Sequence, residues 1–123
     1  MNIIIDTHIF LWLNFDTKKI SKEHLAYLVN LDNRIFLSSI SIAEIMIKKS
    51  IGNLDLDFDI FESIEKMGLE ALDFDGKSAF ALGTLPFYHR DPFDRMIIAQ
   101  AVTRNYKIIT VDNKFEHYSC ELL

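Results

Sequence analysis

Short apolar runs alternate along the chain with longer segments of helical periodicity. The runs at 2–5, 34–37 and 107–111 have few polar positions, which is typical of strands buried on both faces of a sheet. Weaker runs at 69–74 and 119–122 predict two further short strands. The remaining segments predict helices at about 8–15, 21–30, 41–52, 60–68, 76–85 and 92–105.

This alternation of strands and helices predicts an α/β fold. Its central sheet is expected to be mostly parallel, with helices on both faces in a Rossmann-like three-layer arrangement. The length of 123 residues suits one domain, and the sequence has no internal repeat, low-complexity segment or linker. We therefore expect residues 1–123 to form a single domain.

The helix after Asp91 is the most strongly marked element of the chain. Asp91 is predicted to be its N-cap and Pro92 its first residue, because proline lacks an N–H that is not needed there. Its middle is apolar almost all round, so we expect it to be covered on more than one side. Asp94 stands three residues after the cap, where an acid often completes a capping box. Taken alone, this acid pair has a purely structural interpretation.

Other polar residues also predict helix starts. Thr7 is expected to cap the helix 8–15, and Asp75 is expected to cap the helix that Pro86 ends. Glu44 stands three residues after Ser41, which is the spacing of a capping box. The structural interpretation of Glu44 is therefore again a cap.

Five acids are nevertheless expected at one edge of the sheet. Asp6 and Asp112 each end a predicted strand, whereas Glu44, Asp91 and Asp94 lie at helix starts. In a parallel α/β sheet the carboxyl ends of the strands and the N-termini of the following helices share one edge, and ligands bind there. The sequence thus predicts that these five carboxylates meet.

Clustered carboxylates need a compensating cation, because their mutual repulsion otherwise raises their pKa values. Oxygen ligands without cysteine suit a hard ion, Mg²⁺ or Mn²⁺. Such an ion activates a bound water and stabilises charge on a phosphate, which indicates phosphodiester hydrolysis. The chain has no P-loop, no glycine-rich dinucleotide turn and no serine–histidine–acid set to suggest other chemistry.

The formal net charge of −5 argues at first against a nucleic-acid partner. Residues 55–75, however, contain eight of the 18 acids and one of the 13 bases. If the five clustered acids hold metal ions, the other charged residues outside 55–75 are mostly basic. The net charge therefore excludes neither RNA nor DNA.

The cellular compartment is predicted from the cysteine content, the length of the apolar runs and the N-terminal pattern. Cys120 is the only cysteine, so no internal disulfide is possible and a reducing cytoplasm is expected. No apolar run approaches the length of a membrane span, and the N-terminus meets an acid at Asp6 rather than the pattern of a secretory signal.

Four segments of the chain resemble the four motifs of PIN domains. They are Ile4-Ile5-Asp6-Thr7-His8, Ser41-Ile42-Ala43-Glu44-Ile45, His89 to Ala101, and Ile109-Thr110-Val111-Asp112-Asn113-Lys114-Phe115. The string His-Arg-Asp-Pro-Phe-Asp-Arg at 89–95 resembles one subgroup, the VapC-type toxins of toxin–antitoxin modules. The chain departs from this subgroup at Ser78, where a histidine is common, and at Asn105-Tyr106, where Gly-Leu is frequent.

The resemblance implies a PIN-like fold and a metal-dependent ribonuclease that uses Mg²⁺ or Mn²⁺. It implies that a catalytic and metal-binding quartet is formed by Asp6, Glu44, Asp94 and Asp112. Asp91 would be an auxiliary acid or simply the helix cap, and Thr110 matches a hydroxyl residue that can orient a ligand. The implied partners are an RNA substrate, a cognate antitoxin protein and a second copy of the chain in a homodimer.

Basic residues beside the acids have two interpretations. Arg90 and Arg95 can bind RNA phosphates through paired hydrogen bonds, or they can make solvated and helix-dipole contacts of little energetic weight. His8 and His89 also lie beside the acids, and we interpret both as structural histidines rather than metal ligands.

A different class of function is a non-catalytic signalling or binding domain with an acidic metal pocket, such as a receiver-like module that accepts a phosphoryl group. A receiver would have paired acids after the first strand and a lysine after a late strand. Here Asp6 is followed by Thr7, and the late strand ends at Asp112. The sequence therefore favours the nuclease.

Overall fold

The computed structural model describes residues 1–123 and contains one five-stranded sheet. The strands run in the spatial order β3-β2-β1-β4-β5, and every neighbouring pair is parallel. Their bounds are Asn2–Ile5 (β1), Arg34–Ser38 (β2), Glu70–Leu72 (β3), Lys107–Ile109 (β4) and Glu121–Leu122 (β5). The α/β class and the parallel sheet predicted from the sequence are confirmed.

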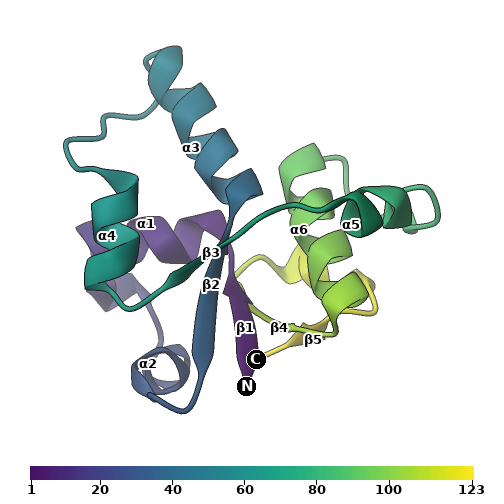
Figure 1. Ribbon diagram of the computed structural model, residues 1–123, viewed down its shortest axis with the longest axis horizontal. Helices are drawn as coiled ribbons and strands as arrows, with labels where there is room; N and C mark the ends of the chain where they lie inside the picture. The colour runs from purple at the N-terminus through teal and green to yellow at the C-terminus, as the bar shows by residue number, and fades with distance from the viewer.

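Helices cover both faces of this sheet (Figure 1). The α-helices are Thr7–Phe15 (α1), Lys22–Val29 (α2), Ser39–Ser50 (α3), Ile60–Lys66 (α4), Gly76–Ala81 (α5) and Pro92–Arg104 (α6). Two 3₁₀ helices complete the chain, at Thr17–Lys19 (η1) and Asn113–His117 (η2). None of the helices combines the length and apolar character needed to cross a membrane.

The central strand β1 divides the core in two. Successive side chains of a strand point to opposite faces, so Ile3 and Ile5 pack into one cluster with α1, α3 and α4. Ile4 packs into the other cluster, which contains α6, η2 and Ile108 of β4. All three isoleucines of β1 are fully buried. Burial on both faces explains why this strand is a continuous apolar run rather than an alternating one.

Helix α6 has the start and the end that its sequence predicts. The Asp91 side chain accepts hydrogen bonds from the N–H groups of Phe93 and Asp94, and Pro92 is the first helical residue. The helix ends where Asn105 adopts a left-handed conformation with φ of 56°, which asparagine tolerates better than most residues. The middle of α6 is buried from residue 97 to 101, as expected.

Two predicted helix starts are wrong. The cap of α1 is Asp6 rather than Thr7, because the Asp6 side chain accepts from the Ile9 N–H. Helix α3 begins at Ser39 with Ser38 as its cap, so Glu44 lies in the second turn and no Ser-x-x-Glu capping box exists there. The chain passes from β2 directly into α3, and this tight connection moves the helix start toward the N-terminus.

One predicted helix end is also wrong. Helix α5 is capped by Asp75 as expected, but it ends at Ala81 instead of continuing to Pro86. Turn residues follow, and the segment 85–91 then leads into α6 without regular structure. This irregular segment contains His89 and the cap residue Asp91.

Candidate functional site

Asp6 and Asp112 follow neighbouring strands and are connected by Thr110. Asp6 comes directly after β1, and Asp112 follows β4 as the N-cap of η2. The Thr110 hydroxyl donates a hydrogen bond to Asp6 Oδ2 and accepts one of 3.0 Å from the backbone N–H of Asp112. Asp6 Oδ1 accepts from the Ile9 N–H at 2.9 Å. One buried hydroxyl therefore fixes the two strand ends relative to each other.

Glu44 reaches this edge from the second turn of α3. Its Oε1 accepts a hydrogen bond of 2.8 Å from the Thr7 hydroxyl, and its Oε2 lies 2.9 Å from Lys48 Nζ. The Thr7 oxygen also lies 2.9 Å from Ser41 Oγ. Glu44 is only 5% exposed, so its carboxylate is stabilised by these protein contacts rather than by water.

Asp94 and His89 form the third part of the cluster. Asp94 lies in the first turn of α6, and its Oδ2 is 2.8 Å from His89 Nε2. One donor atom from each of His89, Asp94 and Asp112 lies within 4.8 Å of the others. Asp6 and Glu44 are not part of this group, but the charge of Asp112 acts on Asp6 and the charge of Glu44 acts on Asp94.

Burial and mutual repulsion make the cluster electrostatically unfavourable without a cation. Burial raises the pKa of Asp6, the hydrogen bonds from Thr110 and Ile9 oppose the rise, and the charge of Asp112 adds to it. Burial also raises the pKa of Asp94 to about 6, with His89 opposing the rise and the charges of Asp91 and Glu44 adding to it. In both cases burial is the main cause, and the neighbouring histidines, His8 for Asp6 and His89 for Asp94, only partly oppose it.

The donor set fits a divalent cation. Asp6, Glu44, Asp94 and Asp112 supply carboxylate oxygens, which are the ligands that Mg²⁺ and Mn²⁺ prefer. A bound dication would also favour the charged forms of Asp6 and Asp94, which burial and neighbouring carboxylates disfavour.

Asp91 lies close to the cluster but has a structural role. Its Oδ1 accepts from the N–H groups of Phe93 at 2.8 Å and Asp94 at 3.2 Å. The cap interpretation is therefore confirmed. The alternative role of Asp91 as an auxiliary acid stays a prediction.

Arg90, just before Asp91, and Arg95, just after Asp94, have different surroundings. Arg95 donates to the carbonyl oxygens of Pro86 at 2.8 Å and Leu85 at 3.3 Å, and to the Tyr118 hydroxyl at 3.3 Å. These contacts occupy its guanidinium, so this conformation leaves it little capacity to bind RNA. Arg90 is exposed, and its side chain makes no hydrogen bond or ion pair within the protein. Of the two, Arg90 is the better placed for a phosphate.

The PIN domain family model matches residues 3–119 of the chain. The chain belongs to the PIN domain family. Members of this family are in general nucleases that use divalent metal ions, and His89, Asp94 and Asp112 of this PIN domain form a group that could hold one.

Solved structures show the same fold. The crystal structure of VapBC2 from Rickettsia felis, bound to a promoter DNA fragment, contains a chain 22% identical to this PIN domain with a TM-score of 0.72, covering 100% of this chain and 98% of that one. VapBC-1 from nontypeable Haemophilus influenzae gives 20% identity and a TM-score of 0.68, covering 100% and 97%. VapBC-5 from Mycobacterium tuberculosis gives 20% identity and a TM-score of 0.61, covering 99% and 97%. Among curated proteins there is no match.

His89 lies closer to the acids than its interpretation as a structural histidine required. Its hydrogen bond with Asp94 fits that interpretation, and its Nε2 also belongs to the group formed with Asp94 and Asp112. Its proximity to Asp94 in the sequence was a signal, but the direction of its imidazole depends on the irregular segment 85–91, which has no periodic pattern to interpret. His8, in contrast, is exposed on α1.

Proposed function

We propose that this PIN domain is a metal-dependent endoribonuclease and the toxin of a toxin–antitoxin pair. The observation that carries the proposal is a PIN fold in which Thr110 joins Asp6 to Asp112, while Asp94 lies beside Asp112 and feels the charge of Glu44. These four acids would hold Mg²⁺ or Mn²⁺, which supplies Lewis-acid stabilisation of a phosphate and an activated water.

The surrounding residues position the acids and the substrate. Thr110 holds Asp6 through its hydroxyl, and Thr7 holds Glu44 in the same way. Arg90 would bind an RNA phosphate, because its exposed guanidinium has no competing protein partner and phosphates accept paired hydrogen bonds from arginine.

The receiver-like alternative has less support. A receiver module has paired acids after its first strand and a lysine after a late strand. In this chain Thr7 follows Asp6, and Asp112 follows β4.

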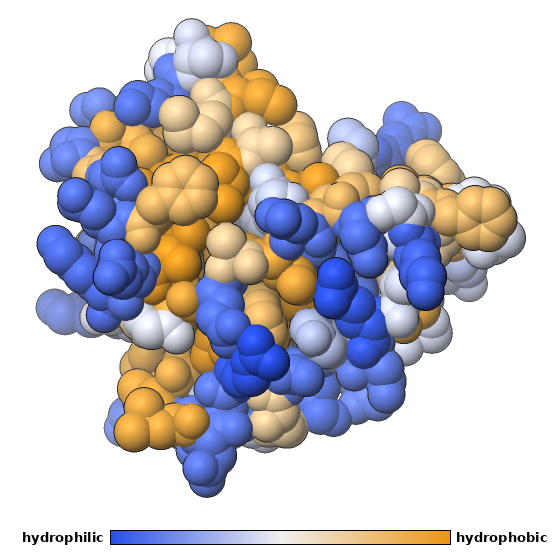
Figure 2. All heavy atoms as spheres, in the orientation of Figure 1, coloured by the Kyte–Doolittle hydropathy of each residue, from blue (hydrophilic) through white to orange (hydrophobic).

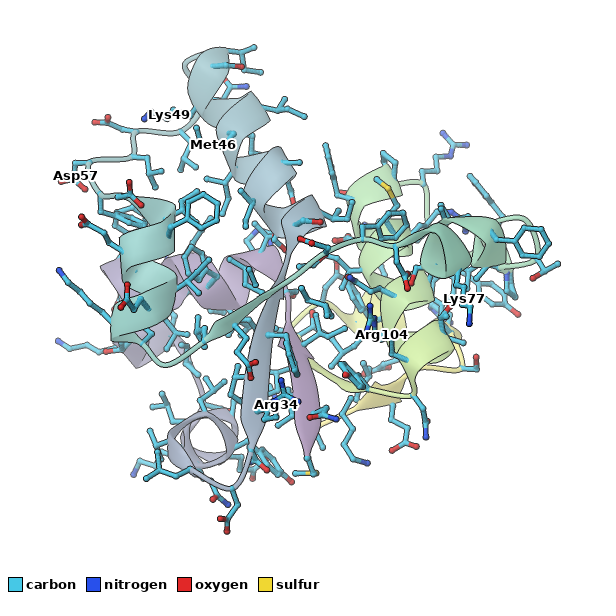
Figure 3. The ribbon with its side chains drawn as sticks, in the orientation of Figure 1. Arg34, Met46, Lys49, Asp57, Lys77 and Arg104 are labelled. Carbon is cyan, nitrogen blue, oxygen red and sulfur yellow. The ribbon has the colours of Figure 1, made fainter.

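The proposed antitoxin would bind an apolar hollow between α3 and α4. The hollow has a volume of about 320 Å³ and is lined mainly by the apolar residues Ile42, Met46, Leu56, Phe58, Ile60 and Phe61. Apolar side chains are visible on the surface of this region in Figure 2, and Figure 3 shows Met46 and Lys49 on α3 with Asp57 on the following loop. Exposed apolar patches of this kind mark sites of protein interaction.

The charges near the hollow suit a partner segment that combines apolar and basic residues. The hollow is lined by one acid, Asp59, and one base, Lys49, and further acids lie in the adjacent loop and in α4: Asp55, Asp57, Glu62 and Glu65. VapBC-5, which has the same fold, is a member of the VapBC family of toxin–antitoxin systems, and this supports a protein partner for this chain. The homodimer implied by the resemblance stays a prediction.

Incubation of the purified protein with total RNA and Mg²⁺, followed by mapping of the cut ends, tests the proposed activity. We expect cuts at defined sequences that disappear in chelator and in an Asp112→Asn variant purified in the same way. A DNA pool of matched sequence shows whether the preference is for RNA. Intact RNA with both Mg²⁺ and Mn²⁺, or cuts that the variant also makes, would refute the proposal.

A further inference from the structure

His89 lies inside the acidic site although it belongs to neither a strand nor a helix. Its side chain is only 11% exposed. Its Nε2 is 2.8 Å from Asp94 Oδ2, and together with Asp112 these residues bring three donor atoms within 4.8 Å of one another. No other histidine of the chain belongs to a group of this kind.

The spacing of these atoms is close to that of ligands around one small dication. When each ligand lies about 2.1 Å from such an ion, adjacent octahedral ligands are about 3 Å apart and opposite ligands about 4.2 Å apart. The separation of 2.8 Å between His89 Nε2 and Asp94 Oδ2 matches an adjacent pair. All three donor atoms lie within 4.8 Å of one another, which is slightly more than the separation of two opposite ligands. A small movement of the side chains toward one another would therefore bring the atoms to ligand distances.

Arg95 and Tyr118 hold the segment that carries His89 in place. Arg95 donates to the carbonyl oxygens of Pro86 and Leu85, and its guanidinium lies 4.5 Å from the centre of the Phe87 ring. Tyr118 accepts a hydrogen bond of 3.2 Å from the Tyr88 N–H. An irregular segment without such anchors would not hold a side chain at a defined position. These contacts therefore account for the placement of the imidazole beside Asp94.

We propose that His89 Nε2 is a nitrogen ligand of the metal site, and that the site therefore prefers Mn²⁺ or another first-row transition dication to Mg²⁺. Imidazole nitrogen binds transition metals well, whereas Mg²⁺ favours sites made of oxygen alone. The proton would reside on Nδ1, which makes no hydrogen bond to the protein. This inference rests on the proposed function, because it specifies the metal of the same site.

The competing explanation is that His89 only donates a hydrogen bond to Asp94. In that role it is a positioning residue, and any group that donates from the same place can replace it. Glutamine is such a group, because its side-chain amide has N–H donors but is a poor ligand for a transition metal. The His89→Gln variant thus separates the two roles.

Pulsed electron paramagnetic resonance of the Mn²⁺-loaded protein gives a direct test. We expect echo modulation from a ¹⁴N nucleus coupled to Mn²⁺, a change of its frequency when histidine carries ¹⁵N, and its loss in His89→Gln. His8→Gln is the matched control, since His8 is exposed next to Asp6 and should leave the modulation unchanged. Absence of nitrogen coupling in the wild-type protein, or its loss in His8→Gln alone, overturns the proposal even if His89→Gln fails to fold.

Titration of the same proteins with Mn²⁺ and Mg²⁺ provides a second readout. We expect His89→Gln to weaken Mn²⁺ binding by about tenfold or more and Mg²⁺ binding much less, so the preference for Mn²⁺ shrinks. An equal loss for both ions would show that His89 only positions Asp94. If the protein cuts RNA and binds Mn²⁺ without nitrogen coupling, only this inference fails. If it binds neither ion and leaves RNA intact, the proposed function fails as well.

Discussion

Thr7 and Glu44 are joined by a buried hydrogen bond of 2.8 Å between the Thr7 hydroxyl and Glu44 Oε1. The two residues come from α1 and α3, and neither has the capping role that its sequence position indicated. Glu44 also pairs with Lys48 one helical turn later, at 2.9 Å. Because Glu44 lies in the second turn of α3, its carboxylate does not cap the helix. Metal binding by Glu44 therefore stays a prediction with which a capping role no longer competes.

The first prediction concerns this carboxylate. Glu44→Gln keeps an oxygen that can accept from Thr7 but removes the charge, so we expect a folded protein whose ribonuclease activity falls by about 100-fold or more. Activity on the mapped RNA and thermal melting are the measurements. Glu62→Gln, the same change at an exposed position of α4, serves as the control. A Glu44→Gln enzyme as active as the Glu62→Gln enzyme would contradict the assignment.

The second prediction uses the sign of a stability change at Asp94. In chelator the acids repel one another, so Asp94→Asn should melt at a higher temperature than the parent. Mg²⁺ or Mn²⁺ should raise the melting temperature of the parent and have much less effect on the variant, because the ion binds only the assembled site. A variant that melts lower in chelator and responds fully to the metal would show that Asp94 does not share the site.

The third prediction concerns pH. Burial raises the pKa of Asp94 from 3.8 to about 6, so between these pH values the folded state retains a proton that the unfolded state has released. The stability of the metal-free protein should therefore fall as pH rises through this interval and be lower at pH 7 than at pH 5. The raised pKa of Asp6 acts in the same direction. Melting curves in chelator at both pH values test this, and the pH difference should be smaller in Asp94→Asn.

The fourth prediction separates Arg90 from Arg95. Arg90→Gln should weaken RNA binding and reduce its salt dependence by about one phosphate contact, with no loss of stability, because this side chain has no protein partner. Arg95→Gln should instead lower the melting temperature, since it removes the bonds to Pro86 and Leu85. Binding to an uncleaved RNA over a range of salt concentrations measures the first effect. Equal salt slopes in the parent and Arg90→Gln would rule out a phosphate contact.

The fifth prediction tests the hollow between α3 and α4. Phe61→Glu places a charge where an apolar partner segment would bind, so it should abolish inhibition by the antitoxin and leave RNA cleavage intact. Val29→Glu is the matched control, because Val29 is 72% exposed on α2. RNA cleavage with and without a candidate antitoxin, sought in the neighbouring reading frames, would measure this. Unchanged inhibition of Phe61→Glu would place the partner elsewhere.

The sequence by itself determined the elements whose signals are local. The apolar run of β1, the Asp91 cap and Pro92 at the start of α6 depend on neighbouring residues only, and all three are as predicted. The position of Asp6 and Asp112 after parallel strands also follows from the alternation of strands and helices. Topology of this kind is fixed by periodicity and by the geometry of parallel crossovers.

Tertiary structure decided which polar groups actually meet. The cap of α3 is Ser38, three residues before the expected cap Ser41, so Glu44 is a buried partner of Thr7 rather than part of a capping box. Arg95 binds backbone carbonyls of the segment before α6, and this anchoring brings His89 to Asp94. Such contacts join residues through irregular backbone and side-chain packing. No periodic pattern encodes them, because their energies depend on neighbours that only the folded chain brings together.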